Sequence, residues 1–142
     1  MPYKILLPFD GSRCSIKAAE YVAQLMASGG DIACTVLFVT PFTRDLAGFL
    51  GIPGDEYSVK IAELADKIRR RASFIFESRG LHVQTALLEG DPVQVICKVA
   101  KREGFDEIVM GSRGYTGIKK IIKGGLSREV AQKAACPVRI IK

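Results

Sequence analysis

Residues 108–130, with the sequence IVMGSRGYTGIKKIIKGGLSREV, contain the end of an apolar strand, a glycine-rich loop and the beginning of a helical pattern. Glycine allows the backbone to approach a ligand closely and to adopt positive φ. The first turn of a helix offers N–H groups that have no intrahelical acceptor, and such groups bind anions. The stretch therefore predicts either an anion-binding loop or a flexible connection between a strand and a helix.

The rest of the chain alternates short apolar segments with amphipathic ones. Strands are predicted at residues 4–9, 32–39, 82–88, 106–110 and 138–141. Helices are predicted to begin near Ser15, Glu56, Pro92 and Leu126. Strands that alternate with helices pair in parallel through right-handed crossovers, and each helix covers a face of the sheet. We therefore expect an α/β fold in one domain, residues 1–142: a doubly wound five-stranded parallel sheet of order 3-2-1-4-5 with helices on both faces.

The net charge of +6 is unevenly distributed along the chain. Residues 1–97 carry 10 basic and 11 acidic side chains, whereas residues 98–142 carry 11 basic and 4 acidic ones. The basic end could attract a nucleotide or a nucleic acid, but its basic residues are not interleaved with aromatic ones, which favours the nucleotide. No apolar run approaches about 18 residues and no basic-then-apolar leader is visible, so we expect a cytoplasmic protein without a membrane segment.

The cysteines and the single histidine give no sign of a metal centre. Cys14, Cys34, Cys97 and Cys136 show neither CxxC spacing nor clustering, and Cys34 and Cys97 lie in apolar segments that we expect to be buried. They are interpreted as structural thiols in a reducing compartment. His82 has no second histidine with which to form a metal site, so no metal site made by protein ligands alone is expected.

The expected strand order brings two distant polar segments to one place. Ligands of doubly wound sheets bind outside the carboxyl ends of the strands, where the strand order reverses. This point lies between the first and fourth strands, so Asp10 and the loop from Gly111 are predicted to face each other. The Asp10 carboxylate could accept hydrogen bonds from a sugar hydroxyl or a base amino group, or it could cap the following helix.

Several motifs together resemble the universal stress protein family over essentially the whole chain. They are the acid at Asp10, the Gly-x2-Gly at Gly111 and Gly114, the nine residues that separate it from Gly124, and the terminal strand after Cys136-Pro137-Val138. The resemblance implies a Rossmann-like α/β domain that is frequently a homodimer through its C-terminal strands. It also implies one of two functional types, which either bind ATP or do not.

In the ATP-binding type of this family, the glycine motif wraps the ribose and phosphates while the first two strands hold the adenosine. The matching positions in this chain are Pro8, Asp10, Val39, Met110, Gly111, Gly114, Gly124 and Ser127. The family pattern has Ser or Thr where this chain has Gly125, so one hydroxyl donor is lost, although the Gly125 N–H and the Ser127 hydroxyl remain. We expect weaker phosphate binding as a result.

Basic side chains in and near the loop leave alternatives open. Arg113 could pair with a phosphate or point to solvent. The lysines at 119, 120 and 123 could add charge near the phosphates or lie in water along a short amphipathic turn. The arginine run at residues 69–71 is interpreted as a solvated part of a helix rather than a docking site.

The leading hypothesis is an adenine-nucleotide-binding regulatory or stress-response protein, with ATP, alone or with Mg²⁺ or Mn²⁺, as its ligand. No general base, nucleophile or metal-ligand cluster is visible around the loop, so at most slow ATP hydrolysis is expected. The alternative is a homodimeric interaction module that does not bind nucleotide. In that case residues 40–57, rich in Phe and Leu, would form a partner-binding surface or dimer arm, although a lid over the sheet edge fits them equally well.

Overall fold

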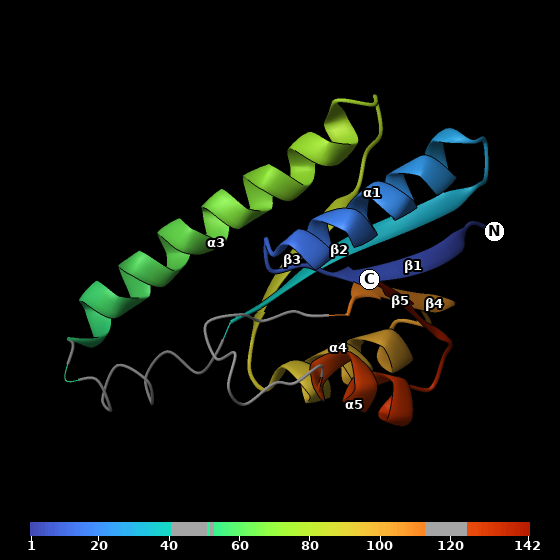
Figure 1. Cartoon of the computed structure of the whole chain (residues 1–142). Helices are drawn as coiled ribbons and strands as arrows, with labels where there is room; N and C mark the ends of the chain where they lie inside the picture. Colours follow the sequence, from blue (N-terminus) through green and yellow to red (C-terminus); the bar gives the residue numbers. More distant parts are fainter. Residues whose placement is uncertain (41–50, 52, 113–124) are drawn as a thin grey trace.

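A computed structural model describes residues 1–40, 51, 53–112 and 125–142 (Figure 1). Its strands are β1 (Tyr3–Pro8), β2 (Ile32–Thr40), β3 (Gln84–Glu89), β4 (Glu107–Gly111) and β5 (Val138–Ile141). Its helices are α1 (Arg13–Ala27), α3 (Gly54–Glu77), α4 (Pro92–Arg102) and α5 (Gly125–Lys133).

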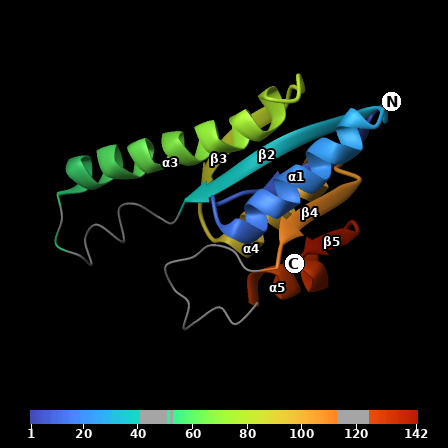
Figure 2. The same ribbon diagram turned by 45° about the horizontal axis from the view of Figure 1, so that its top comes forward.

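The five strands form one parallel sheet in the order β3-β2-β1-β4-β5, which confirms the predicted fold. Helices α1 and α3 cover one face of this sheet, and α4 and α5 cover the other (Figures 1 and 2). The chain thus begins in the middle of the sheet, builds outward to β3, and returns past β1 to add β4 and β5. Strands β1 and β4, about a hundred residues apart in sequence, are therefore neighbours at the centre of the sheet.

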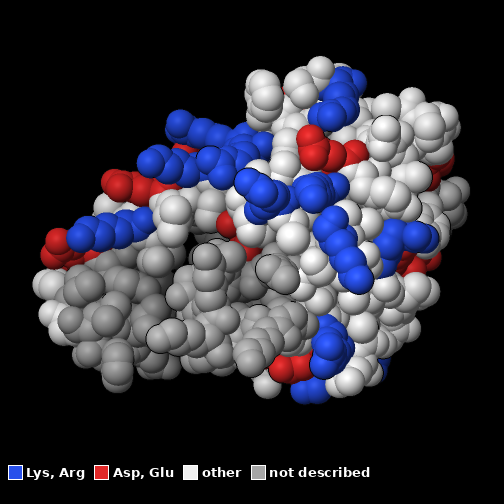
Figure 3. All heavy atoms as spheres, in the orientation of Figure 1, with Lys and Arg blue, Asp and Glu red and all other residues white. Residues whose placement is uncertain are grey.

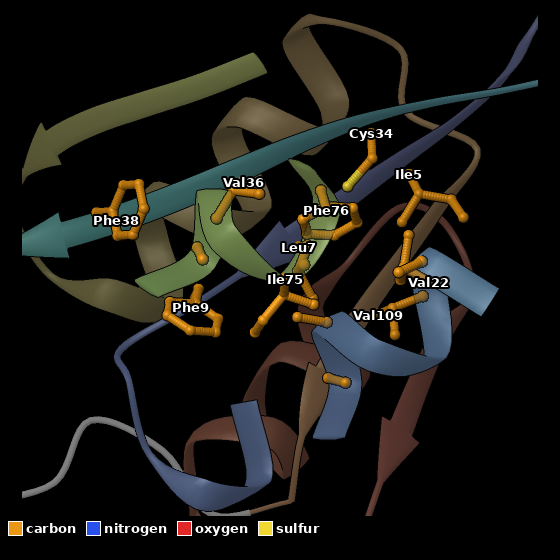
Figure 4. Close-up of a cluster of buried hydrophobic side chains, with 14 residues drawn as sticks. Ile5, Leu7, Phe9, Val22, Cys34, Val36, Phe38, Ile75, Phe76 and Val109 are labelled. Carbon is orange, nitrogen blue, oxygen red and sulfur yellow. The ribbon is translucent and has the colours of Figure 1, made fainter. Parts of the chain in front are cut away.

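The core consists of two apolar layers because β1 is covered on both faces. Ile5, Leu7 and the following Phe9 point toward α1 and α3, where Phe76 and Val22 pack against them (Figure 4). Leu6 points the opposite way, toward α4 and α5. Such strands have near-continuous apolar sequences, since alternate side chains enter different layers.

Side-chain caps fix the beginnings of two helices. The hydroxyl of Ser12, the N-cap of α1, accepts a hydrogen bond from the Ser15 N–H at 3.2 Å. The Asp91 carboxylate caps α4 by accepting from the Gln94 N–H at 3.1 Å, and Pro92 follows in the first turn. The helix start predicted near Pro92 is confirmed, and Asp followed by Pro is a characteristic helix start.

The predicted third strand and the predicted burial of one cysteine need correction. The first pair between β2 and β3 joins Thr35 to Gln84, so β3 begins at Gln84. His82 therefore precedes the strand, and its side chain is exposed. Cys97 lies on the margin of the α4 layer and is only half-buried. Cys34 is buried as expected, and this burial raises the pKa of its thiol to about 12.

An ion pair joins the edge strand β5 to the middle of the sheet. The buried carboxylate of Glu107 on β4 accepts a hydrogen bond from Arg139 Nε of β5 at 2.8 Å and another from the Tyr3 hydroxyl at 3.0 Å. The Arg139 guanidinium also lies 5.6 Å from the centre of the Tyr21 ring on α1. These contacts hold β5 beside β4, whose opposite end leads into the candidate site.

Candidate functional site

Strands β1 and β4 part before either of them ends. Their last paired residues are Leu6 and Ile108; beyond this point β1 pairs only with β2, and β4 only with β5. Backbone groups in a strand point alternately to its two neighbours, and the Phe9 N–H donates to β2. Position 8 therefore faces β4, and Pro8 has no N–H with which to continue that ladder. The parted ends form the predicted switch point at the carboxyl edge of the sheet.

The corner between β1 and α1 places Asp10 at this edge. The Asp10 carboxylate oxygen Oδ1 accepts a hydrogen bond from the Ser12 N–H at 2.9 Å. Gly11 between them has φ +82°, a conformation that glycine adopts without steric cost. Because Ser12 is the N-cap of α1, the side chain of Asp10 holds the corner rather than capping the helix.

The first turn of α1 lies directly against the end of β4. A Cβ atom added to Gly111 would lie 2.6 Å from the backbone carbonyl carbon of Cys14 and 2.7 Å from its Cβ. The Cys14 Sγ atom is also 3.7 Å from the Ser112 hydroxyl oxygen. The structure therefore brings the corner after β1 and the backbone at the end of β4 together, and only a residue without a side chain fits at position 111.

The start of α5 is attached to the same segment. The buried Ser127 hydroxyl donates to the Ser112 carbonyl oxygen at 3.2 Å, and the Ser112 N–H donates to the Ile141 carbonyl at 2.8 Å. Gly125 is the first residue of α5. The N–H groups in the first turn of this helix have no intrahelical acceptor and carry partial positive charge.

Val39 and Met110 belong to the apolar layer beneath this edge. Their side chains are 7% and 3% exposed and share one cluster with Leu126 of α5. The layer thus joins the carboxyl ends of β2 and β4 to the beginning of α5.

Three predicted site residues, Arg113, Gly114 and Gly124, lie outside the described residues, as do the loop lysines and most of the segment from 40 to 57. The other predicted site residues all lie at or beneath the carboxyl edge: Pro8, Asp10, Val39, Met110, Gly111, Gly125 and Ser127. The described ranges contain no group of three His, Cys, Asp or Glu side chains that could hold a metal ion. They also contain no helix with the length and apolar character needed to cross a membrane.

Three residues at this edge, Cys14, Ser112 and Arg71, were not predicted from the sequence. Cys14 and Ser112 looked like ordinary helix and loop residues, and only their packing against Gly111 and Ser127 gives them a place in the site. Arg71 of α3 donates to the Gly11 carbonyl at 3.4 Å. Its position in the middle of a helix gave no signal of this contact.

Comparison with protein-family models matches residues 1–142 to the universal stress protein family. The chain belongs to this family. Its relatives include the universal stress protein MJ0531 of Methanocaldococcus jannaschii, 31% identical over 98% of this chain and 81% of the relative. The universal stress protein YxiE of Bacillus subtilis is also 31% identical, over 98% of both chains.

Solved structures of universal stress proteins share the fold. The structure of MJ0577, another M. jannaschii protein, superposes with a TM-score of 0.82 at 29% identity and covers 100% of this chain and 96% of its own. A more distant structure, a universal stress protein in complex with cAMP, has a TM-score of 0.66 at 18% identity and covers 98% of this chain and 95% of that chain. Another, the universal stress protein from Archaeoglobus fulgidus in complex with dAMP, has a TM-score of 0.68 at 22% identity and covers 100% of this chain and 98% of that chain. At these identities the last two show a common fold only.

The close approach at Gly111 predicts the effect of adding one methyl group. Gly111→Ala is expected to lower the free energy of unfolding by about 1–3 kcal/mol, since the backbone of Cys14 must move to admit a Cβ. Urea unfolding measures the change. Gly30→Ala is the matched control, because its added Cβ would meet the flexible end of Ile32 at 3.4 Å and the Leu25 carbonyl oxygen at an ordinary contact distance of 3.8 Å, and it is expected to change stability by less than about 0.5 kcal/mol. Equal effects of the two substitutions would contradict the packing of α1 against β4.

Proposed function

We propose that this protein is a regulatory stress-response protein that binds an adenine nucleotide, primarily ATP, at the carboxyl edge of the sheet. One observation carries the proposal: where β1 and β4 part, the carboxylate of Asp10, the bare backbone of Gly111 and the first turn of α5 lie at the same edge. A nucleoside with phosphates needs these three features, namely an acceptor for hydroxyl or amino groups, room for close approach, and N–H groups for anions.

The adenosine half of the site rests on Asp10 and the apolar layer. An ionised carboxylate has about four acceptor positions, so Asp10 can accept from a ribose hydroxyl or a base amino group while it accepts from the Ser12 N–H. Val39 and Met110 supply apolar surface beneath the purine.

The phosphate half rests on backbone groups. The Ser127 hydroxyl proton is already directed to the Ser112 carbonyl, and Gly125 has no hydroxyl. The phosphates would then be held by N–H groups of the first turn of α5, with Arg113, Gly114 and Gly124 completing the loop. Mg²⁺ or Mn²⁺ would be carried mainly by phosphate oxygens and water. We therefore propose that the protein binds ATP and hydrolyses it slowly at most.

The relatives support an adenine ligand. A universal stress protein has been solved with cAMP and another with dAMP, and both share this fold.

We also propose that residues 1–142 act as one cytoplasmic domain and that β5 pairs with β5 of a second copy. The second of these proposals is supported by the position of β5 as the last strand of the sheet, where Ile140 is 38% exposed.

A second candidate is a homodimeric interaction module that does not bind nucleotide. The specific observation in its favour is that neither Gly125 nor Ser127 offers a hydroxyl donor to a phosphate. One lost hydrogen bond to a charged acceptor costs about 1.5–3 kcal/mol, which weakens a nucleotide site without necessarily abolishing it. Mass spectrometry of the denatured purified protein separates the candidates, since co-purified adenine nucleotide supports the first.

Calorimetric titration with ATP, with and without Mg²⁺ and against GTP, tests the proposal. We expect saturable binding of ATP in preference to GTP, and Asp10→Ala should weaken it by about tenfold or more, because hydrogen bonds to a charged group are lost. Asp106→Ala is the matched control: the Asp106 carboxylate also accepts one backbone N–H, from Lys4 at 2.8 Å, but at the opposite end of the sheet. Absence of saturable binding at millimolar ATP would overturn the proposal.

Gly125 provides an independent test of the phosphate half. Gly125→Ser restores a hydroxyl and should strengthen ATP binding about threefold to tenfold, whereas adenosine binding should not change. Gly125→Ala is the control, because it changes the helix propensity of this position without adding a donor. If the serine and alanine variants bind ATP equally well, phosphates do not lie at the start of α5.

A further inference from the structure

Three consecutive arginines of α3 have different partners. Arg69 and Arg70 form ion pairs with Asp66 at 2.5 Å and 2.9 Å, and the hydrogen bond from Arg69 lowers the pKa of the Asp66 carboxyl. Arg71 instead donates from Nη1 to the Gly11 carbonyl oxygen of the β1–α1 corner at 3.4 Å. Basic side chains gather along α3 in the space-filling view (Figure 3), but only Arg71 of the three has this contact.

Helix geometry explains the division. Arg69 and Arg70 follow Asp66 by three and four residues, so they lie on its side of the helix, whereas Arg71 is rotated about 140° from Asp66. Arg71 lies one turn after Ile68, whose Cγ1 is 3.6 Å from the position that a Cβ of Gly11 would occupy. The side of α3 that bears Ile68 and Arg71 therefore packs on the corner that presents Asp10.

Arg71 and Asp10 hold opposite ends of one peptide unit. The Gly11 carbonyl accepts from Arg71, and the N–H of the same planar peptide, that of Ser12, donates to Asp10 Oδ1 at 2.9 Å. A guanidinium donor and a carboxylate acceptor polarise this peptide in the same direction, so the two hydrogen bonds strengthen each other. Glycine has the greatest backbone freedom of any residue, so the orientation of the peptide depends on such external partners.

We propose that Arg71 is a positioning residue for Asp10: by fixing the Gly11–Ser12 peptide, it sets the direction in which the Asp10 carboxylate faces the adenosine half of the site. The proposal rests on the proposed function, since Asp10 is the ligand acceptor there. Arg71 acts through the corner and not on the phosphates, so its contribution is the same for ligands with and without phosphate groups.

Arg71→Ala tests the proposal, with Arg70→Ala as the matched control from the same helix turn. We expect Arg71→Ala to weaken adenosine and ATP binding by the same factor, about threefold to tenfold, while Arg70→Ala leaves both affinities unchanged. Arg71→Lys should recover most of the affinity, because one donor suffices. Both arginines are exposed, so neither variant is expected to unfold, and circular dichroism checks this.

Two results would overturn the proposal. One is unchanged affinity of Arg71→Ala for both ligands, and the other is a loss confined to ATP, which would assign Arg71 to the phosphates. The NMR shift of the Ser12 amide proton gives a ligand-free readout: it should move upfield in Arg71→Ala and stay in place in Arg70→Ala. If the wild-type protein binds no nucleotide, the proposed function fails, while the Ser12 shift still decides whether Arg71 orients the corner.

Discussion

The contact between the first turn of α1 and the end of β4 is the constraint on which the arrangement of the candidate site depends. Gly111 allows the Cys14 backbone to approach to a distance that a side chain would block. With α1 in this position, Cys14, which follows the Asp10 corner in the chain, lies next to Ser112, whose carbonyl accepts a hydrogen bond from Ser127 of α5. One close approach therefore aligns three segments that are far apart in the sequence.

The topology of the sheet supplies the opening that these segments surround. β1 is the central strand, and the chain leaves it toward β3 first and toward β5 later, so helices cover opposite faces on the two sides. The ladder between β1 and β4 stops at Leu6 and Ile108, and Pro8 cannot extend it. Buried apolar side chains fill the layers on both faces of the sheet, and the candidate site lies above them at the carboxyl edge. The Glu107–Arg139 pair holds β5 at the other end of β4.

Much of this could be predicted because the relevant signals are local. Continuous apolar strands, helical periodicity and the Asp91-Pro92 start each follow from neighbouring residues, and alternation of strands and helices then restricts the topology. The start of β3 was misplaced at His82 because an extended connector and a strand have the same sequence pattern. The contact between Arg71 and Gly11 could not be predicted, because the spacing from Asp66 separates Arg71 from Arg70 but does not show that the two partners, 60 residues apart in sequence, lie together in the fold.

The two halves of the candidate site differ in how much they rely on side chains. In the proposed site, the adenosine half would use the Asp10 carboxylate, which accepts a hydrogen bond from the Ser12 N–H, whereas the phosphate half would use backbone N–H groups. An ATP titration monitored by NMR through the backbone amide shifts is the most direct test of whether a nucleotide binds where β1 and β4 part. The largest changes are predicted at residues 10–12, 110–112 and 125–127. Changes confined to the opposite edge of the sheet, around Tyr3 and Glu107, or no changes at millimolar ATP, would contradict the assignment.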